Sequence, residues 1–177
     1  MEYYELIETR QSCRNYNGDK VVESEKLHKV VEAGLISPSA RNRQPWHYYI
    51  VTGESAQGVR KGCQVGGANK FLDNVNAFLV VSMERVNKMP SVAGILAKVQ
   101  DFTQYDIGLS VMQITLACTS LGLSSCILGW FNEKIVQTAI SQNVDIALVI
   151  AVGYARDEDA LRAKVRAKYE DKVTEIK

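Results

Sequence analysis

The spacing of hydrophobic and polar positions predicts a chain in which helices alternate with strands. Apolar residues at helical spacing predict helices over residues 2–10, 24–36, 55–62, 102–122 and 133–141. Short runs rich in β-branched and aromatic residues predict strands over residues 46–53, 77–83, 124–128 and 146–154. We expect Ser24 to be the N-cap of the second helix, and the apolar run 77–83 to be buried on both faces. This order of elements indicates an α/β or α+β layer fold.

Two segments have a less regular pattern. Residues 84–102 contain Pro90, which we expect to begin a short helix. From Leu161 to Tyr169 apolar residues alternate with arginine and lysine. This period of two favours an extended segment with one basic edge, whereas the alanine, lysine and arginine content favours a helix. We prefer the extended form, because helical spacing would scatter the apolar residues around the segment.

The longest stretch without charge runs from Ile107 to Asn132, 26 positions in all. Its length is sufficient for a membrane-spanning helix. However, serine, threonine and glutamine are spread through it, and Gly122 interrupts it. We therefore expect a buried helix followed by a strand rather than a membrane span.

The predicted long helix carries a stripe of small and polar residues at intervals of three and four. Its members are Ser110, Gln113, Ala117, Ser120 and Ser124. Such a stripe permits close helix packing, either against a helix of the same chain or across a two-fold subunit interface. The pattern alone leaves both explanations open.

Composition narrows the class of protein. The chain has 177 residues, 46% hydrophobic and 23% charged, which is typical of a globular protein and leads us to expect one domain over residues 1–177. Its net charge of +1 gives no overall field that would attract nucleic acid or an acidic membrane. Any anion-binding site must therefore come from local clustering of basic residues.

The cysteines suggest core packing rather than metal or redox chemistry. The four cysteines form no C-x-x-C motif, and only two histidines accompany them, so we expect no zinc site. Cys118 and Cys126 lie among apolar residues and are expected in the core. Acidic residues interrupt the N-terminal segment, which does not resemble a signal peptide, and we expect a reducing, cytoplasmic location.

Three basic groups stand out in the sequence. They are Arg10 with Arg14, Lys70 in a glycine-rich turn, and Lys164 with Arg166. Each is compatible with an ordinary solvated surface. Brought together, they would suit a phosphate, because the planar guanidinium binds phosphate oxygens in pairs, and Ser12 would add a neutral donor.

The stretch "PSARNRQPW" (residues 38–46) places Asn42 and Gln44 in a loop before a strand. Neutral amides held in such a loop can hydrogen-bond the carbonyls and ring nitrogens of a heterocycle. Alternatively they cap backbone groups of the loop, while Trp46 fills the core.

Taken together, these motifs resemble the nitroreductase family of flavoproteins. The resemblance rests on the Arg10, Ser12, Arg14 triplet, "PSxxNxQPW", the stretch "DIGLSVMQITLACTSLGLSSCILGWF", the strand "VIAVGY" and the C-terminal pair Lys164 and Arg166. These segments cover nearly the whole chain in the family's order. The resemblance implies an α+β fold with a mostly antiparallel sheet flanked by helices, a long central helix, and a C-terminal extension exchanged between the subunits of a homodimer.

The resemblance also implies one FMN at each of two sites in the dimer interface. The phosphate and ribityl end would be held by Arg10, Ser12, Arg14, Lys164 and Arg166. The other subunit would line the flavin with Pro38, Ser39, Ala40 and Asn42. Lys70, with Asn69 beside it, would lie near the pyrimidine edge, and the backbone of Leu128 and Gly129 would face N5 of the flavin.

The implied activity is transfer of two electrons from NAD(P)H to an electron-poor acceptor such as a nitroaromatic or a quinone, in a ping-pong cycle. The flavin would be the reactive group, so no catalytic side chain is expected. The chain is short for this family and lacks a clear lid motif like that of iodotyrosine deiodinases. Dehalogenating and flavin-cleaving relatives are therefore less favoured. A flavin-binding sensor or storage protein would share the same binding residues, and a structural dimer with solvated basic patches would need no flavin.

Overall fold

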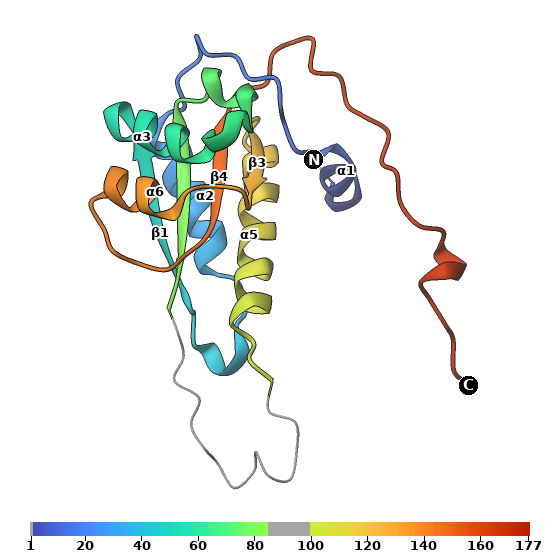
Figure 1. Ribbon diagram of the computed structural model, residues 1–177. Helices are drawn as coiled ribbons and strands as arrows, with labels where there is room; N and C mark the ends of the chain where they lie inside the picture. The colour runs from blue at the N-terminus through green and yellow to red at the C-terminus, as the bar shows by residue number, and fades with distance from the viewer. Residues whose placement is uncertain (1, 85–99) are drawn as a thin grey trace, which may run out of the picture.

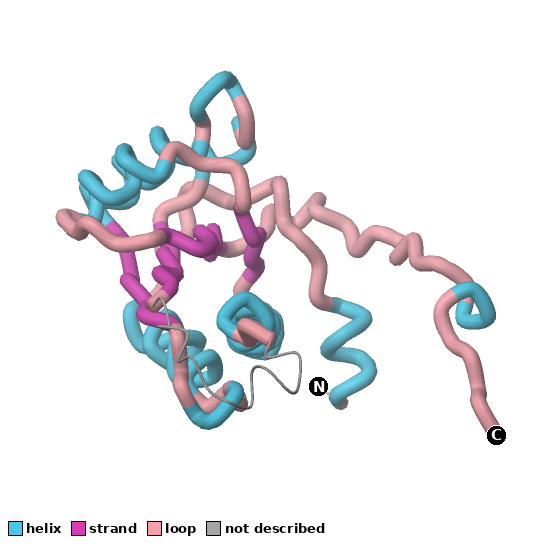
Figure 2. Tube along the Cα trace, turned by 60° about the horizontal axis from the view of Figure 1, so that its bottom comes forward, coloured by secondary structure: helices cyan, strands magenta, loops and turns pink. Residues whose placement is uncertain are grey.

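The computed structural model describes residues 2–84 and 100–177, in which a four-stranded sheet lies between two layers of helices (Figures 1 and 2). The strands are β1 (Trp46–Thr52), β2 (Ala77–Met83), β3 (Ser124–Leu128) and β4 (Ile146–Gly153). Their order across the sheet is β1-β2-β4-β3, and each neighbouring pair is antiparallel. The expected α+β fold with an antiparallel sheet is thus confirmed.

Helices cover both faces of the sheet (Figure 2). One layer contains α2 (Ser24–Leu35) and α5 (Thr103–Ser120), and the other contains α3 (Gly53–Cys63) and α6 (Glu133–Ile140). Successive side chains of a strand point to opposite faces. On β2, Phe78 and Val80 therefore pack in one apolar cluster, while Leu79 and Val81 pack in the other. This strand is buried on both faces, as its apolar sequence predicts.

The long uncharged stretch forms most of α5 and all of β3. Within α5, Ser110 is fully buried and donates a hydrogen bond to the carbonyl of Gly34 on α2 at 2.8 Å. At this position the small-residue stripe therefore serves packing within the chain. No helix among residues 2–84 and 100–177 has both the length and the apolar character needed to cross a membrane.

Helix and strand boundaries agree with the predicted ones to within two residues, with one difference in capping. Ser24 is the first residue of α2, and Glu23 takes the N-cap position. The Glu23 carboxylate accepts a hydrogen bond from the Tyr154 hydroxyl at 2.6 Å, a long-range contact that a local pattern does not reveal. The loop before β1 also contains a short 3₁₀ helix, η1 (Ala40–Asn42). The short helix expected at Pro90 falls outside the described residues.

Both ends of the chain lie beyond the β3 edge of the sheet (Figure 1). The first helix, α1 (Tyr3–Thr9), is followed by an N-terminal loop (residues 10–17), and β4 is followed by a C-terminal segment (residues 155–177). This segment runs away from the sheet and is extended except for the short helix η4 (Tyr169–Asp171). The extended form predicted from its alternating pattern is confirmed over most of its length.

Candidate functional site

The N-terminal loop runs along the edge strand β3. Ser12 forms a parallel bridge with Ser125, and the Cys13 amide donates to the Ser125 carbonyl at 2.9 Å. Cys13 is buried, and alternate residues of an extended segment share a side. Of the residues predicted to hold a phosphate, Arg14 is exposed at this sheet edge, and Arg10 and Ser12 are half-buried.

The C-terminal segment returns to this same loop. The Lys164 ammonium donates to the carbonyl of Arg10 at 2.7 Å, and Arg162 donates through Nη2 to the carbonyl of Ser12 at 2.6 Å. The structure thus brings together the basic residues of the two termini, which the sequence could only suggest. Arg166 follows two positions after Lys164 on the same extended segment.

Positive charge accumulates where the two segments meet. The pKa of Lys164 is lowered, first by burial and then by the nearby guanidinium groups of Arg10, Arg166 and Arg162. Within the described part of the chain, the side chains of Arg10 and Arg14 make no hydrogen bond or ion pair. Glu8 and Asp159 offset part of this charge, but the cations outnumber them, and such an excess of positive charge fits a dianionic group such as a phosphate ester.

The end of β3 presents open backbone beside the Lys70 loop. Leu128 is buried, whereas Gly129 is exposed, and a Cβ added to Gly129 would meet no atom within 4 Å. Asn69 has a left-handed backbone (φ 50°) and donates its amide to the carbonyls of Cys63 at 2.9 Å and Trp130 at 3.4 Å. These bonds hold the loop that carries the exposed Lys70 next to the chain that leaves β3. The backbone of Gly129 is therefore open beside this loop.

The "PSARNRQPW" loop lies at the far end of α5. The amide of Ala40 donates to the Asp106 carboxylate in the first turn of α5 at 3.1 Å. The N-terminal loop instead meets β3, which follows the last turn of the same helix (Figure 1). The 18 residues of α5, at a rise of 1.5 Å each, separate the two groups by about 27 Å. One chain therefore does not bring Pro38, Ser39, Ala40 and Asn42 to Arg10.

The amides of that loop are partly used within it. Gln44 donates from its backbone to the Ser39 hydroxyl at 3.0 Å and from its side chain to the Asn42 side-chain oxygen at 3.2 Å. Arg41, Asn42 and Gln44 have φ values of 57°, 53° and 49°, in the left-handed region. The loop is thus held in a defined, unusual shape by its own amides, as the capping explanation predicted.

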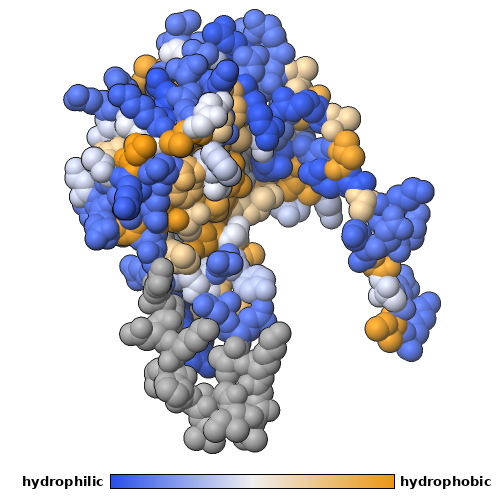
Figure 3. Space-filling view, in the orientation of Figure 1, coloured by the Kyte–Doolittle hydropathy of each residue, from blue (hydrophilic) through white to orange (hydrophobic). Residues whose placement is uncertain are grey.

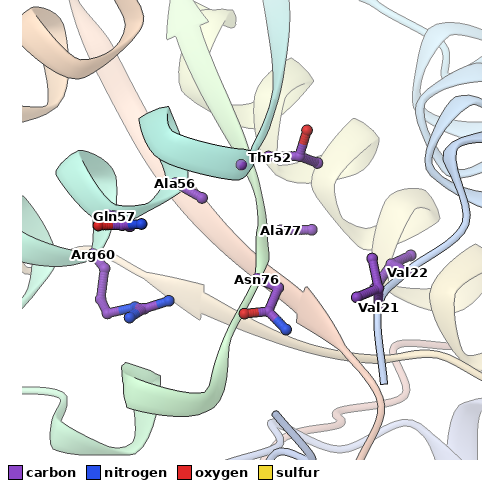
Figure 4. Close-up of a pocket in the computed structure, with 9 residues that line it drawn as sticks. Val21, Val22, Thr52, Ala56, Gln57, Arg60, Asn76 and Ala77 are labelled. Carbon is purple, nitrogen blue, oxygen red and sulfur yellow. The ribbon is translucent and has the colours of Figure 1, made fainter. Parts of the chain in front are cut away.

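A separate cavity of about 370 Å³ lies between the end of β1, the start of β2 and α3 (Figure 4). Val22 and Ala77 contribute apolar walls, and Gln57, Asn76 and Arg60 contribute polar ones. Arg60 donates to the carbonyl of Val75 at 2.7 Å. None of the residues predicted to hold a cofactor lines this cavity, so it is distinct from the basic site.

Three residues that join the termini were not predicted from the sequence. They are Gln11, Asp159 and Arg162, which link the N-terminal loop to the C-terminal segment. Gln11 does stand inside the Arg10 to Arg14 stretch, but no local pattern reveals that its amide pairs with a segment about 150 positions later.

Comparison with known proteins identifies the class. The nitroreductase family model matches residues 7–154, and the chain belongs to this family. It is 27% identical to an oxygen-insensitive NADPH nitroreductase of Helicobacter acinonychis, covering 84% of this chain and 85% of the relative. The resemblance inferred from the motifs is thus confirmed.

Solved structures agree with the fold. A nitroreductase family protein of Clostridium difficile is 26% identical, with a TM-score of 0.79 and 98% of both chains covered. A protein of Exiguobacterium sibiricum, solved in complex with FMN, has a TM-score of 0.80 at 18% identity, covering 99% of this chain and 98% of its own. At this identity the second likeness supports the fold alone.

Proposed function

We propose that the protein is an FMN-dependent oxidoreductase that takes two electrons from NAD(P)H and passes them to an electron-poor acceptor such as a nitroaromatic or a quinone. The observation that carries this proposal is the cation cluster formed by Arg10, Lys164 and Arg166, in which the Lys164 ammonium lies on the Arg10 carbonyl at 2.7 Å. Membership of the nitroreductase family supports the same conclusion. A surface of merely solvated charges would not require basic residues from both ends of the chain to converge.

The phosphate of FMN would be held by the cation cluster. Arg10, Arg14, Lys164 and Arg166 supply positive charge and Ser12 supplies a hydroxyl, all at the junction of the N-terminal loop with the C-terminal segment. Charge-assisted hydrogen bonds of this kind each contribute roughly 1.5–3 kcal/mol when well aligned.

The ring system would lie along the end of β3. The open backbone of Leu128 and Gly129 would face N5, and the exposed Lys70 would lie near the pyrimidine edge. A cation there stabilises negative charge that develops during electron uptake. Asn69 already donates to two carbonyls, so its main contribution would be to hold the Lys70 loop in place.

We further propose that the complete site requires a homodimer. The face of α5 away from the sheet exposes Tyr105, Leu109 and Met112, which are 57%, 50% and 42% exposed. Figure 3 views the opposite side, that of α3 and α6, where apolar surface is also visible. Pairing α5 with its copy in antiparallel orientation would place residues 38–42 of one chain beside Arg10 of the other. The extended C-terminal segment, with Val165 89% exposed, would pack on the partner subunit.

In this proposal the cofactor carries the chemistry and the chain positions it. Bound FMN supplies reversible two-electron transfer, so donor and acceptor can use one site in turn, in a ping-pong cycle. The basic residues fix the phosphate end, the glycine backbone keeps the ring accessible, and Lys70 supplies electrostatic stabilisation. No side chain is assigned as a nucleophile or as an essential acid or base, because solvent can supply the protons.

The visible absorption spectrum of the purified protein, before and after heat denaturation, tests the cofactor. We expect a flavin spectrum and release of FMN, and oxidation of NAD(P)H when a quinone is added. A colourless protein that also fails to take up FMN would overturn the proposal. A flavin protein that does not turn over would be a binding or storage module instead.

The phosphate assignment has its own test in the variant Arg10→Ala. Loss of one charge-assisted contact should weaken FMN binding about 10- to 100-fold while leaving riboflavin, which lacks the phosphate, unaffected. The variant Lys61→Ala removes an exposed positive charge from α3 and is the matched control. Equal FMN affinity in both variants would show that Arg10 does not hold the phosphate.

A further inference from the structure

The two segments that carry the cation cluster are joined by a reciprocal pairing through one glutamine. The Gln11 side chain donates to the Ala160 carbonyl at 3.3 Å and accepts from the Arg162 amide at 3.1 Å. A primary amide used in this way imitates the paired donor and acceptor of a neighbouring strand. The two bonds therefore fix the register of the C-terminal segment against the N-terminal loop as well as the distance between them.

An ion pair between a buried carboxylate and a half-exposed guanidinium strengthens the same junction. The Asp159 side chain is only 7% exposed, and its Oδ1 accepts from Nη1 of Arg162 at 3.0 Å. The other guanidinium nitrogen of Arg162 donates to the Ser12 carbonyl at 2.6 Å. Burial of a carboxylate is costly unless a cation compensates it, so Asp159 holds Arg162 in this place.

Arg162 is the cation that contacts the Asp159 carboxylate. Its second oxygen, Oδ2, is buried without a hydrogen bond among the described residues. Cys13 lies nearby, and burial, with a smaller contribution from Asp159, raises the pKa of its thiol to about 11. The neighbouring thiol is therefore neutral at ordinary pH and brings no second charge.

Arg162 thus differs from Arg10 and Arg14 of the cluster. Its two terminal nitrogens are both engaged, one by Asp159 and one by the Ser12 carbonyl, whereas Arg10 and Arg14 make no hydrogen bond or ion pair through their side chains in the described part of the chain. It stands two positions before Lys164 on an extended segment, where alternate residues share a side. Fixing Arg162 therefore fixes the direction in which Lys164 and Arg166 point.

We propose that Gln11, Asp159 and Arg162 are positioning residues that clamp the C-terminal segment to the N-terminal loop and so hold the phosphate-binding cations in one arrangement. The expected effect on FMN binding rests on the proposed function. The contacts among Gln11, Asp159, Arg162 and the N-terminal loop are present in the chain without FMN. Asp159 thereby assists an anion site although its own charge repels anions.

Electrostatics and the clamp predict opposite effects of Asp159→Asn on FMN affinity, so this variant distinguishes between them. Simple electrostatics predicts tighter FMN binding, because a negative charge near the phosphate is removed. The clamp predicts weaker binding, because a neutral amide holds Arg162 less firmly than the carboxylate does and the cations lose part of their arrangement. Asp157→Asn is the matched control, since Asp157 is exposed in the same turn and its variant removes the same charge.

The dissociation constants of FMN and riboflavin are measured for each variant by flavin fluorescence. We expect FMN to bind Asp159→Asn about tenfold more weakly than wild type, with riboflavin unchanged and Asp157→Asn equal to or slightly tighter than wild type. FMN affinity in Asp159→Asn equal to or above that of wild type would overturn the proposal. An equal loss for riboflavin would also overturn it, because the effect would then be general and not directed at the phosphate.

Hydrogen exchange of residues 160–168 in the flavin-free protein gives a second readout that does not depend on the cofactor. Exchange should be faster in Asp159→Asn and unchanged in Asp157→Asn. If Asp159→Asn does not fold, Arg162→Gln replaces it, with Lys168→Gln as the control that loses the same charge from an exposed position. If wild type binds no FMN, the proposed function fails, while unchanged exchange in the clamp variants separately overturns the clamp.

Discussion

Lys164 shows how a single side chain acquires its properties from distant parts of the chain. Alone in the sequence it is an ordinary surface lysine. In the structure its ammonium donates to the carbonyl of Arg10 at 2.7 Å, and its pKa is lowered first by burial and then by three nearby guanidinium groups. Repulsion among these cations is unfavourable in the free protein, and their attraction to a bound anion would compensate for it.

This crowding predicts proton uptake on FMN binding. The pKa of Lys164 is low in the free protein and rises beside a bound phosphate, so at alkaline pH the complex holds more protons than its separate components. FMN affinity should therefore fall as pH rises through the free-protein pKa of Lys164. Calorimetric titration with FMN at about pH 9, in buffers of different ionisation enthalpy, measures the uptake, because the phosphate is already fully ionised there.

Lys164→Gln should reduce that proton uptake, and Lys168→Gln, which removes the same charge from an exposed position, should not. Uptake of the same size in Lys164→Gln as in wild type would assign the proton to another group.

The cysteines yield a second prediction at the scale of single residues. All four are free and buried. Burial raises the pKa of Cys63 and Cys118 to about 12 and that of Cys13 to about 11, and only the thiolate reacts readily. Ellman's reagent should label none of them quickly in the native protein and all four after unfolding in guanidinium chloride. A native thiol that reacts as fast as free cysteine would contradict this expectation.

At the scale of elements, close packing of α2 on α5 supports the layer on which the predicted dimer face lies. A Cβ added to Gly34 would lie 2.8 Å from Cδ1 of Ile114 and 3.1 Å from the Ser110 hydroxyl. The Ser110 hydroxyl also pairs with that of Tyr48, so α2, α5 and β1 meet at this point. The glycine is needed here for space.

Gly34→Ala should therefore lower the free energy of unfolding by about 1–3 kcal/mol, the usual cost of overpacking. Gly108→Ala is the control on α5, because its Cβ would meet no atom within 4 Å, and it should raise stability by up to about 1 kcal/mol. Urea unfolding followed by circular dichroism measures both. Equal stability of Gly34→Ala and wild type would mean that the helices separate at little cost.

The order of helices and strands could be predicted from the sequence, because it depends on hydrophobic patterns among neighbouring residues. The run from Ala77 to Met83 is apolar at consecutive positions, which suits a strand covered on both faces, and the uncharged stretch contains enough turns for a buried helix. Ser24 was expected to be the N-cap of α2, but Glu23 takes that position, and its carboxylate accepts from the hydroxyl of Tyr154, 131 positions away. Contacts of that range leave no periodic trace in the sequence.

At the scale of the whole molecule, the predicted site residues fall into two groups at opposite ends of α5. Arg10 and Lys164 lie together near the last turn, and Ala40 is bonded to Asp106 in the first turn. This separation is the main structural reason for proposing a dimer. If the apolar outer face of α5 paired with its copy about a two-fold axis, the Ala40 group of each chain would meet the Arg10 group of the other. Two such combined sites would form, one at each end of the paired helices.

Leu109→Glu should separate the subunits and lower flavin content together. Leu109 is 50% exposed in the chain, and a carboxylate at the centre of an apolar interface is strongly unfavourable. Size-exclusion chromatography with light scattering should show the mass of two chains for wild type and of one chain for the variant. Val21→Glu, at a 73% exposed valine near the separate cavity, is the control and should remain a flavin-bearing dimer. A wild-type monomer with full FMN content would contradict the shared site.

The sequence by itself determined which segments become helices and strands, and which residues carry the nitroreductase motifs, because both depend on neighbouring residues and their spacing. Only the tertiary structure decided that Lys164 meets Arg10, that Asp159 and Gln11 lock the same junction, and that Ala40 lies about 27 Å away along α5. These relations depend on how the sheet orders its strands and where α5 crosses it. Long-range packing sets that geometry, and no window of the sequence contains it.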